Sequence, residues 1–319
     1  IGARNAYSKT VYTNDSTSEK GELKRILRTT HCGTASFHGK QVGKEKQQQI
    51  AIENVHQLRS FFPDGQKITM NVLNSPINPT GIDKAIDSQI QGAALGSLGT
   101  VSKATTPVNN LRLISQNNNS GYESMIQLVA DIAHEGKCND IKTFLETGKG
   151  KDAAITALDE IKNSKEVALY KYAINAKANM ERSHFLWDPD NSNVELASDM
   201  AIISSMLNDK DNKLIPAQWS DKQKQDAAEI ISQCASGKDR TGLLETHATH
   251  KALCQEFGND AKDPKHLQAL INGGHTQILT SINGGTAGAY GIKEDTHSAF
   301  PKMYTKNITG LQLNTASFN

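Results

Sequence analysis

The chain is 319 residues long and its charge is balanced, with 35 Lys and Arg residues against 34 Asp and Glu residues and a formal net charge of +1. This balance excludes a globally basic nucleic-acid-binding protein and a chain kept disordered by charge repulsion. Hydrophobic residues make up 37% of the sequence, enough for a core. No apolar run approaches the roughly 18 residues of a membrane-spanning helix, so no transmembrane segment is expected.

The start of the sequence carries no targeting pattern. It does not begin with Met, and no basic segment followed by an apolar one is present. We expect no signal peptide and a sequence that is a fragment or a processed form. The length fits one large domain or two ordinary ones, and we interpret residues 1–319 as a single domain.

Four cysteines are too few for a disulfide framework, and no two of them have C-x-x-C spacing. We predict that Cys32, Cys138 and Cys254 are free thiols in a reducing compartment. His247 and His250 lie three residues apart in a predicted helix, but further metal ligands are missing. We predict that both histidines are surface residues, and that the protein binds no metal and no cofactor.

The first third of the chain contains three recognisable elements. A capping pattern at Ser18 predicts a short helix through Leu27. Apolar residues at helical spacing predict a helix over residues 44–62, and β-branched residues with partial alternation predict a strand over residues 67–73. Residues 82–120 are rich in Gly, Ser and Asn and predict no element.

Residues 121–210 carry apolar side chains at helical spacing throughout. The predicted helices cover residues 122–133, 141–145, 153–180 and 194–207. A polar stretch with a glycine precedes this block. We therefore expect residues 121–210 to form a helical insertion or cap within the domain.

Residues 226–250 predict a strand, a loop of small residues and a helix. An apolar run leads to Cys234, and the sequence then continues Ala-Ser-Gly-Lys-Asp-Arg-Thr-Gly. An amphipathic helix is predicted over residues 243–253. A second helix over residues 265–282 and a glycine-rich loop over residues 283–293 follow.

Cleaving a phosphate monoester without a metal needs an ionised nucleophile, N–H groups around the phosphate, a planar cation and an acid. Small side chains in the loop let backbone N–H groups turn inward as an anion-binding nest; they are Ala235, Ser236 and Gly237. The helix N-terminus and Arg240 are expected to lower the pKa of Cys234 below the ordinary value of about 8.5. Arg240 is suited to a two-bonded contact with phosphate, and Thr241 to a hydrogen bond with the thiolate or the loop.

The run from Cys234 to Gly242 resembles the C-x5-R-[ST] signature of the cysteine-based phosphatases. It departs from the tyrosine-phosphatase form in two places, because Gln233 replaces the usual His and Asp239 precedes the arginine. Asp at that position is similar to myotubularin-type and Sac-type phosphoinositide phosphatases. The whole string resembles the bacterial secretion-system effectors that are phosphoinositide phosphatases, related to inositol polyphosphate 4-phosphatases. A weaker similarity extends to residues 283–293.

The resemblance implies an α/β fold, with a cysteine-based phosphatase-like core, a central sheet flanked by helices and a helical insertion. It implies that Cys234 forms a phosphocysteine intermediate, that Arg240 binds the phosphate in the ground and transition states, and that Asp239 is the general acid. The substrate-binding residues would be Ala235, Ser236, Gly237, Lys238, Thr241 and Lys293. Lys238 would add charge above the pocket, and Lys293 would contact a second ring phosphate.

The identity of the acid stays open at this point. Asp239 can instead be a structural carboxylate that holds the loop. Asp188 and Asp190 lie in a Trp-Asp-Pro-Asp sequence that resembles a mobile acid-bearing loop, although a turn that ends a helix is the simpler interpretation.

The favoured function is metal-independent removal of the 3-phosphate of a phosphoinositide headgroup at a membrane surface. The resemblance implies a secreted protein, translocated into a host cell and peripheral at host membranes, with no nucleic-acid partner. A soluble inositol-polyphosphate or phosphoprotein phosphatase is the first alternative. A helical host-protein interaction module with a vestigial anion-binding loop is the second. The sequence predicts neither the ring position with certainty nor the membrane-targeting element or the oligomeric state.

Overall fold

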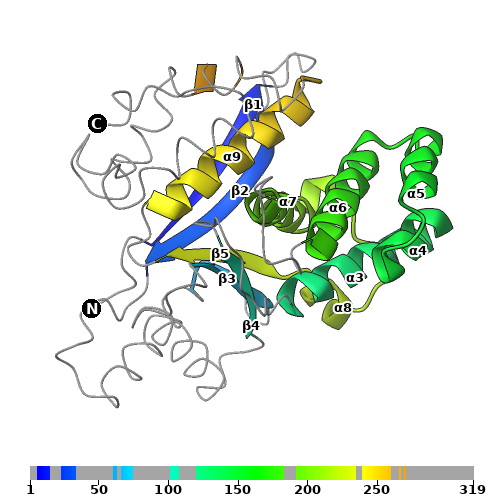
Figure 1. Cartoon of the computed structure of the whole chain (residues 1–319), viewed down its shortest axis with the longest axis horizontal. Helices are drawn as coiled ribbons and strands as arrows, with labels where there is room; N and C mark the ends of the chain where they lie inside the picture. Colours follow the sequence, from blue (N-terminus) through cyan, green and yellow to red (C-terminus); the bar gives the residue numbers. More distant parts are fainter. Residues whose placement is uncertain are drawn as a thin grey trace.

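A computed structural model describes residues 6–14, 23–33, 60–62, 66–74, 101–107, 120–182, 192–234, 239–259, 266 and 269–270. Within them, five strands form one sheet in the order β1-β2-β5-β3-β4, and helices pack against it (Figure 1). The expected α/β architecture, a sheet flanked by helices, is therefore confirmed. No helix in these ranges combines the length and the apolar character needed to cross a membrane.

The sheet is mixed, with one antiparallel pair at its edge. The strands are β1 (Tyr7–Asn14), β2 (Leu23–Gly33), β3 (Ile68–Asn74), β4 (Val101–Pro107) and β5 (Glu229–Cys234). β1 runs antiparallel to β2, whereas β2, β5, β3 and β4 are parallel to one another. The carboxyl ends of the four parallel strands therefore gather at one edge, which is where open α/β sheets bind ligands.

The helix predicted from Ser18 through Leu27 is wrong where the structure describes the chain, because residues 23–33 form β2. This strand pairs with β1 on one side and with β5 on the other. Burial of Leu27 and pairing on both edges outweigh the local capping pattern. The strand predicted over residues 67–73 is confirmed as β3. β4 lies in the stretch for which no element was predicted.

The helical character predicted for residues 121–210 is confirmed where the structure describes them, which leaves out residues 183–191. The helices are α3 (Ser120–Glu135), α4 (Asn139–Thr147), α5 (Lys151–Ala157), η2 (Leu158–Glu160), α6 (Ser164–Arg182), α7 (Ser192–Leu207) and η3 (Lys210–Asn212). The segment predicted as one helix over residues 153–180 is two, because the chain becomes extended at Ile161 between η2 and α6. α8 (Asp221–Gln225) and α9 (Asp239–Glu256) follow, and residues 266 and 269–270 are helical as well.

The helical block shares a core with the sheet. Leu27 of β2 and Ile230 of β5 belong to the same buried apolar cluster as side chains of α3, α6 and α7. α7 lies in the angle where β2 and β5 separate (Figure 1). That the block is an insertion or cap stays a prediction. The helices predicted over residues 44–62 and 265–282 lie almost wholly outside the described residues.

Two serines of α7 accept backbone hydrogen bonds from β2 and β5 in the segment where these two strands are not paired with each other. The backbone N–H of Ile230 donates to Ser204 Oγ at 3.2 Å, and the N–H of Arg28 donates to Ser205 Oγ at 2.7 Å. Ser204 Oγ in turn donates to the carbonyl oxygen of Ala228 at 3.0 Å. These bonds satisfy buried backbone groups that would otherwise lack a partner.

We predict that Ser204→Ala lowers the free energy of unfolding by about 1–3 kcal/mol, because the buried N–H of Ile230 loses its acceptor. Urea denaturation measures the change. Thr156→Ala, at an exposed position of α5, is the control and should stay within about 0.5 kcal/mol of the parent protein. Equal effects of the two changes would contradict this role for Ser204.

Candidate functional site

Cys234 lies at the carboxyl end of the central strand β5. Its backbone pairs with Gly33 of β2, and the residue before it pairs with Val72 of β3. α9 begins at Asp239, and Arg240 is its second residue. The predicted order of strand, short loop and helix is therefore confirmed at both ends of the loop. The structure places the backbone of Cys234, Asp239 and Arg240 at these two ends.

The contacts of α9 show that it runs back along β2. Near the end of α9, Glu256 Oε1 forms an ion pair with Lys24 Nζ of β2 at 2.7 Å. Earlier in α9, Glu245 Oε2 contacts His31 Nε2 at 2.5 Å. Moving toward the start of α9 therefore means moving toward Gly33. The helix N-terminus, with its partial positive charge, is thus brought to the sheet edge where β5 ends.

The remaining predicted site residues divide into two groups. Thr241 is fully buried in the first turn of α9, a place that suits a structural bond to the loop. The other five lie outside the described residues; they are Ala235, Ser236, Gly237, Lys238 and Lys293. Asp188 and Asp190 lie outside them as well. Among the described residues, no three His, Cys, Asp or Glu side chains gather so that they could hold a metal ion.

A buried polar group between α9 and the sheet was not predicted. We call it the Glu245 cluster: Glu245, His31, Lys9, Thr29 and Thr249. Lys9 Nζ lies 3.0 Å from Glu245 Oε1, Thr249 Oγ1 donates to the same oxygen at 3.0 Å, and Thr29 Oγ1 donates to Oε2. The Glu245 side chain is fully buried. All three elements that meet at this place, β1, β2 and α9, therefore bond to one carboxylate.

The partners of Glu245 stabilise the negative charge of its carboxylate. Burial acts to raise the pKa of Glu245, but the hydrogen bond from His31, the charge of His31 and the charge of Lys9 outweigh it. The pKa of Glu245 therefore lies well below its usual range. A carboxyl group of this kind stabilises the folded protein above its unfolded pKa, and the contribution is lost as the pH falls.

The prediction that His247 and His250 are surface residues is wrong. Their exposed fractions are 2% and 1%, because α9 is covered by the sheet on one side and by α7 on another. His247 Nε2 lies 2.9 Å from Glu195 Oε1 of α7, and His250 Nε2 lies 3.4 Å from Cys254 Sγ. Cys32, Cys138 and Cys254 are free thiols, as predicted.

A second buried charge network joins α7 to α9. Lys251 Nζ of α9 lies 2.6 Å from Glu195 Oε2 and also forms an ion pair with Asp199. Burial raises the pKa of Asp199 to about 7, although the charge of Lys251 opposes the shift. α9 is thus bonded on two sides, to the sheet through Glu245 and to α7 through Glu195. Each of these glutamates binds one histidine and one lysine.

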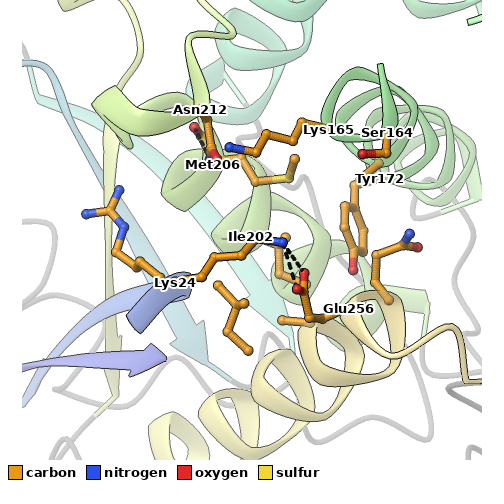
Figure 2. A pocket seen from close by; sticks show the side chains of 13 residues that line it. Lys24, Ser164, Lys165, Tyr172, Ile202, Met206, Asn212 and Glu256 are labelled. Atoms are coloured by element: carbon orange, nitrogen blue, oxygen red, sulfur yellow. Dashed lines mark hydrogen bonds and ion pairs between the residues drawn. The ribbon is translucent and has the colours of Figure 1, made fainter. Parts of the chain in front are cut away.

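A cavity of about 230 Å³ lies between β2, α6, α7 and α9 (Figure 2). Cys234 is not among the residues that line it. Ile202, Met206 and Tyr172 contribute to its wall, and the ion pair of Lys24 and Glu256 lies at its edge. Lys24 belongs to the amino end of β2 and Glu256 to the carboxyl end of α9. The cavity therefore lies at the opposite end of these elements from the loop.

Comparison with known proteins supports a phosphatase-like fold. No family model matches the sequence, and no curated protein matches it either. A solved structure of a Legionella phosphoinositide phosphatase matches 95% of this chain with a TM-score of 0.58 and 13% sequence identity. The match covers 37% of the Legionella chain, so the present chain spans little more than a third of that length. The chain therefore has a fold similar to that of a bacterial phosphoinositide phosphatase.

We predict that Glu245→Gln makes the free energy of unfolding depend less on pH under acidic conditions. In the unfolded parent protein, the carboxyl group of Glu245 takes up a proton as the pH falls through about 4.3. In the folded protein the same group stays ionised, so the free energy of unfolding falls as the pH falls through this value. The variant should lose less stability than the parent between about pH 6 and pH 3, by at least about 1 kcal/mol. Urea denaturation at a series of pH values tests this. Parallel curves for parent and variant would contradict it.

Proposed function

We propose that the protein is a phosphoinositide phosphatase that acts through Cys234. The observation that carries the proposal is the strand–loop–helix order, in which β5 ends at Cys234 and α9 begins at Asp239. The likeness to a Legionella phosphoinositide phosphatase supports it. The C-x5-R sequence, which runs from the end of β5 into the start of α9, supplies a nucleophile, an anion-binding loop and a planar cation in one segment.

In the first step, the thiolate of Cys234 attacks phosphorus, so that a sulfur–phosphorus bond forms and the phosphorus–oxygen bond to the inositol ring breaks. The leaving oxygen takes a proton from an acid, for which we propose Asp239. Arg240 and the backbone N–H groups of residues 235–238 stabilise the charge on the transferring phosphoryl group. The start of α9 adds its partial positive charge at the same place.

In the second step, water attacks the phosphocysteine. The carboxylate that gave its proton now accepts one from the water, the sulfur–phosphorus bond breaks, and inorganic phosphate and the thiolate are released. No electron acceptor or cofactor enters this balance. We propose that no metal ion is needed, because the loop and Arg240 supply the positive charge.

The proposed substrate is a phosphoinositide headgroup, from which the 3-phosphate is removed. Lys238 adds a positive charge in the loop, which suits a ring that carries several phosphates, and Lys293 is proposed to contact a second ring phosphate. We propose that the protein is secreted, is translocated into a host cell and acts as a peripheral protein at host membranes.

We predict that the purified chain releases phosphate from a panel of phosphoinositides, most rapidly from those with a 3-phosphate, and that EDTA leaves the rate unchanged. Cys234→Ser should lower the rate by at least about 1,000-fold. Cys138→Ser, which changes a free thiol on the helical side of the molecule, should have no effect.

Release from soluble inositol polyphosphates or phosphopeptides alone would contradict the proposed substrate. Absence of release from every substrate, with no difference between the parent protein and Cys234→Ser, would contradict the enzyme and favour an interaction module.

We predict that iodoacetate labels Cys234 with a midpoint at least about one pH unit below the free-thiol value of about 8.5. Arg240→Met should move this midpoint upward. Cys138 provides an internal reference, since burial and the nearby carboxylates of Glu166 and Glu160 raise the pKa of that thiol. Peptide mapping separates the two cysteines. Labelling of Cys234 only above about pH 8 would contradict an activated nucleophile.

A further inference from the structure

The Glu245 cluster lies close to the proposed catalytic loop both along β2 and along α9. On β2, His31 pairs with Ser232, and Gly33, two residues further on, pairs with Cys234. On α9, Glu245 is six residues beyond the first residue of the helix, or about 9 Å along its axis. The strand before the loop and the helix after it are therefore joined close to the loop.

The bonds of the cluster are directional, unlike the apolar contacts around them. Glu245 accepts from Lys9 of β1 and from Thr29 and His31 of β2, so three of its four partners belong to strands. Leu244 and Ala248 beside it are buried as well, but apolar packing alone permits a helix to slide. A slide of about 1 Å would break hydrogen bonds of normal length.

The ring of His31 is held mainly by this carboxylate. Its Nε2 atom lies 2.5 Å from Glu245 Oε2, whereas its Nδ1 atom is buried and has no hydrogen-bond partner among the described residues. The Tyr7 ring lies against it, with the ring centroids 5.2 Å apart. Removing the carboxylate would therefore release a buried histidine two residues from Gly33, the pairing partner of Cys234.

We propose that Glu245, with His31 and Lys9, is a positioning group that fixes the start of α9 relative to the end of β5. The proposal rests on the proposed function, since it assigns Glu245 a role in placing Arg240 and the helix N-terminus against Cys234. Catalysis of this kind needs groups held within about 0.5 Å of their working positions. Glu245 itself touches neither substrate nor reacting atoms.

The other glutamate that fastens α9 provides a matched control. Glu195 also binds one histidine and one lysine, His247 and Lys251, but it joins α9 to α7 instead of to the sheet. Glu245→Gln and Glu195→Gln therefore each remove one negative charge from a group that contains one histidine and one lysine, although Glu245 is fully buried and Glu195 is partly exposed. They differ in whether the network reaches the strand beside Cys234.

The experiment compares the parent chain and these two variants by urea denaturation, by kcat and KM on a short-chain phosphoinositide, and by the pH midpoint of Cys234 alkylation. We expect Glu245→Gln to lower kcat at least tenfold and to raise the alkylation midpoint by at least half a pH unit. Glu195→Gln should stay within threefold in kcat and leave the midpoint unchanged. Equal losses in both variants, or an unchanged midpoint in Glu245→Gln, would overturn the proposal.

A milder change covers the case in which Glu245→Gln does not fold. Thr29→Val removes one hydrogen bond to the carboxylate from the β2 side and should shift kcat and the midpoint in the same directions, by a few fold and by a smaller fraction of a pH unit. No shift in this variant would count against the proposal. The alkylation readout needs no turnover, so a failure of the proposed function, seen as absent phosphate release, is distinguishable from a failure of the positioning role.

Discussion

The structure depends on the parallel pairing of β5 between β2 and β3. This pairing places the last residue of β5, Cys234, at the carboxyl edge in the middle of the sheet. Because α9 must then return along the sheet to bury its apolar side, its N-terminus is held at the same edge. Any oxyanion chemistry at this edge combines the end of a buried strand with the start of a long helix.

The elements around this unit act as its supports. α7 separates β2 from β5 at the far end of the sheet and satisfies their backbone groups with Ser204 and Ser205. It also holds one side of α9 through Glu195, while the Glu245 cluster holds the side that faces the sheet. The helical block thus packs against α9 as well as against the sheet, while we propose that the position of the start of α9 depends on the Glu245 cluster.

Local patterns in the sequence predicted the described helices of residues 121–210 and the strand–loop–helix unit. In residues 121–210, apolar spacing carries the signal within each helix, and the C-x5-R run lies within one short segment. Contacts between distant segments escaped prediction. β2 is stabilised by pairing with residues some 200 positions away, and the Glu245 cluster joins residues 9, 29, 31 and 245. Nothing near Glu245 in the sequence indicates its partners.

The histidines of α9 illustrate the same limit. His247 and His250 look like polar residues of a surface helix, but α9 is enclosed by both the sheet and α7. Each polar side chain then needs a partner from another element, such as Glu195 for His247. Thr241, Glu245 and Thr249 lie at helical spacing and are buried in the structure. Polar residues at this spacing are also typical of a solvent-exposed face, so the spacing alone does not distinguish the two.

Trapping the covalent intermediate tests whether Cys234 is the nucleophile. The parent protein is mixed with a phosphoinositide carrying a 3-phosphate, quenched in acid within milliseconds and analysed by peptide mass spectrometry. We expect one phosphoryl group on Cys234 of the parent protein and none in the Cys234→Ser variant. Turnover by the parent with no phosphoryl group on Cys234 at any time, or undiminished turnover by the variant, would contradict it.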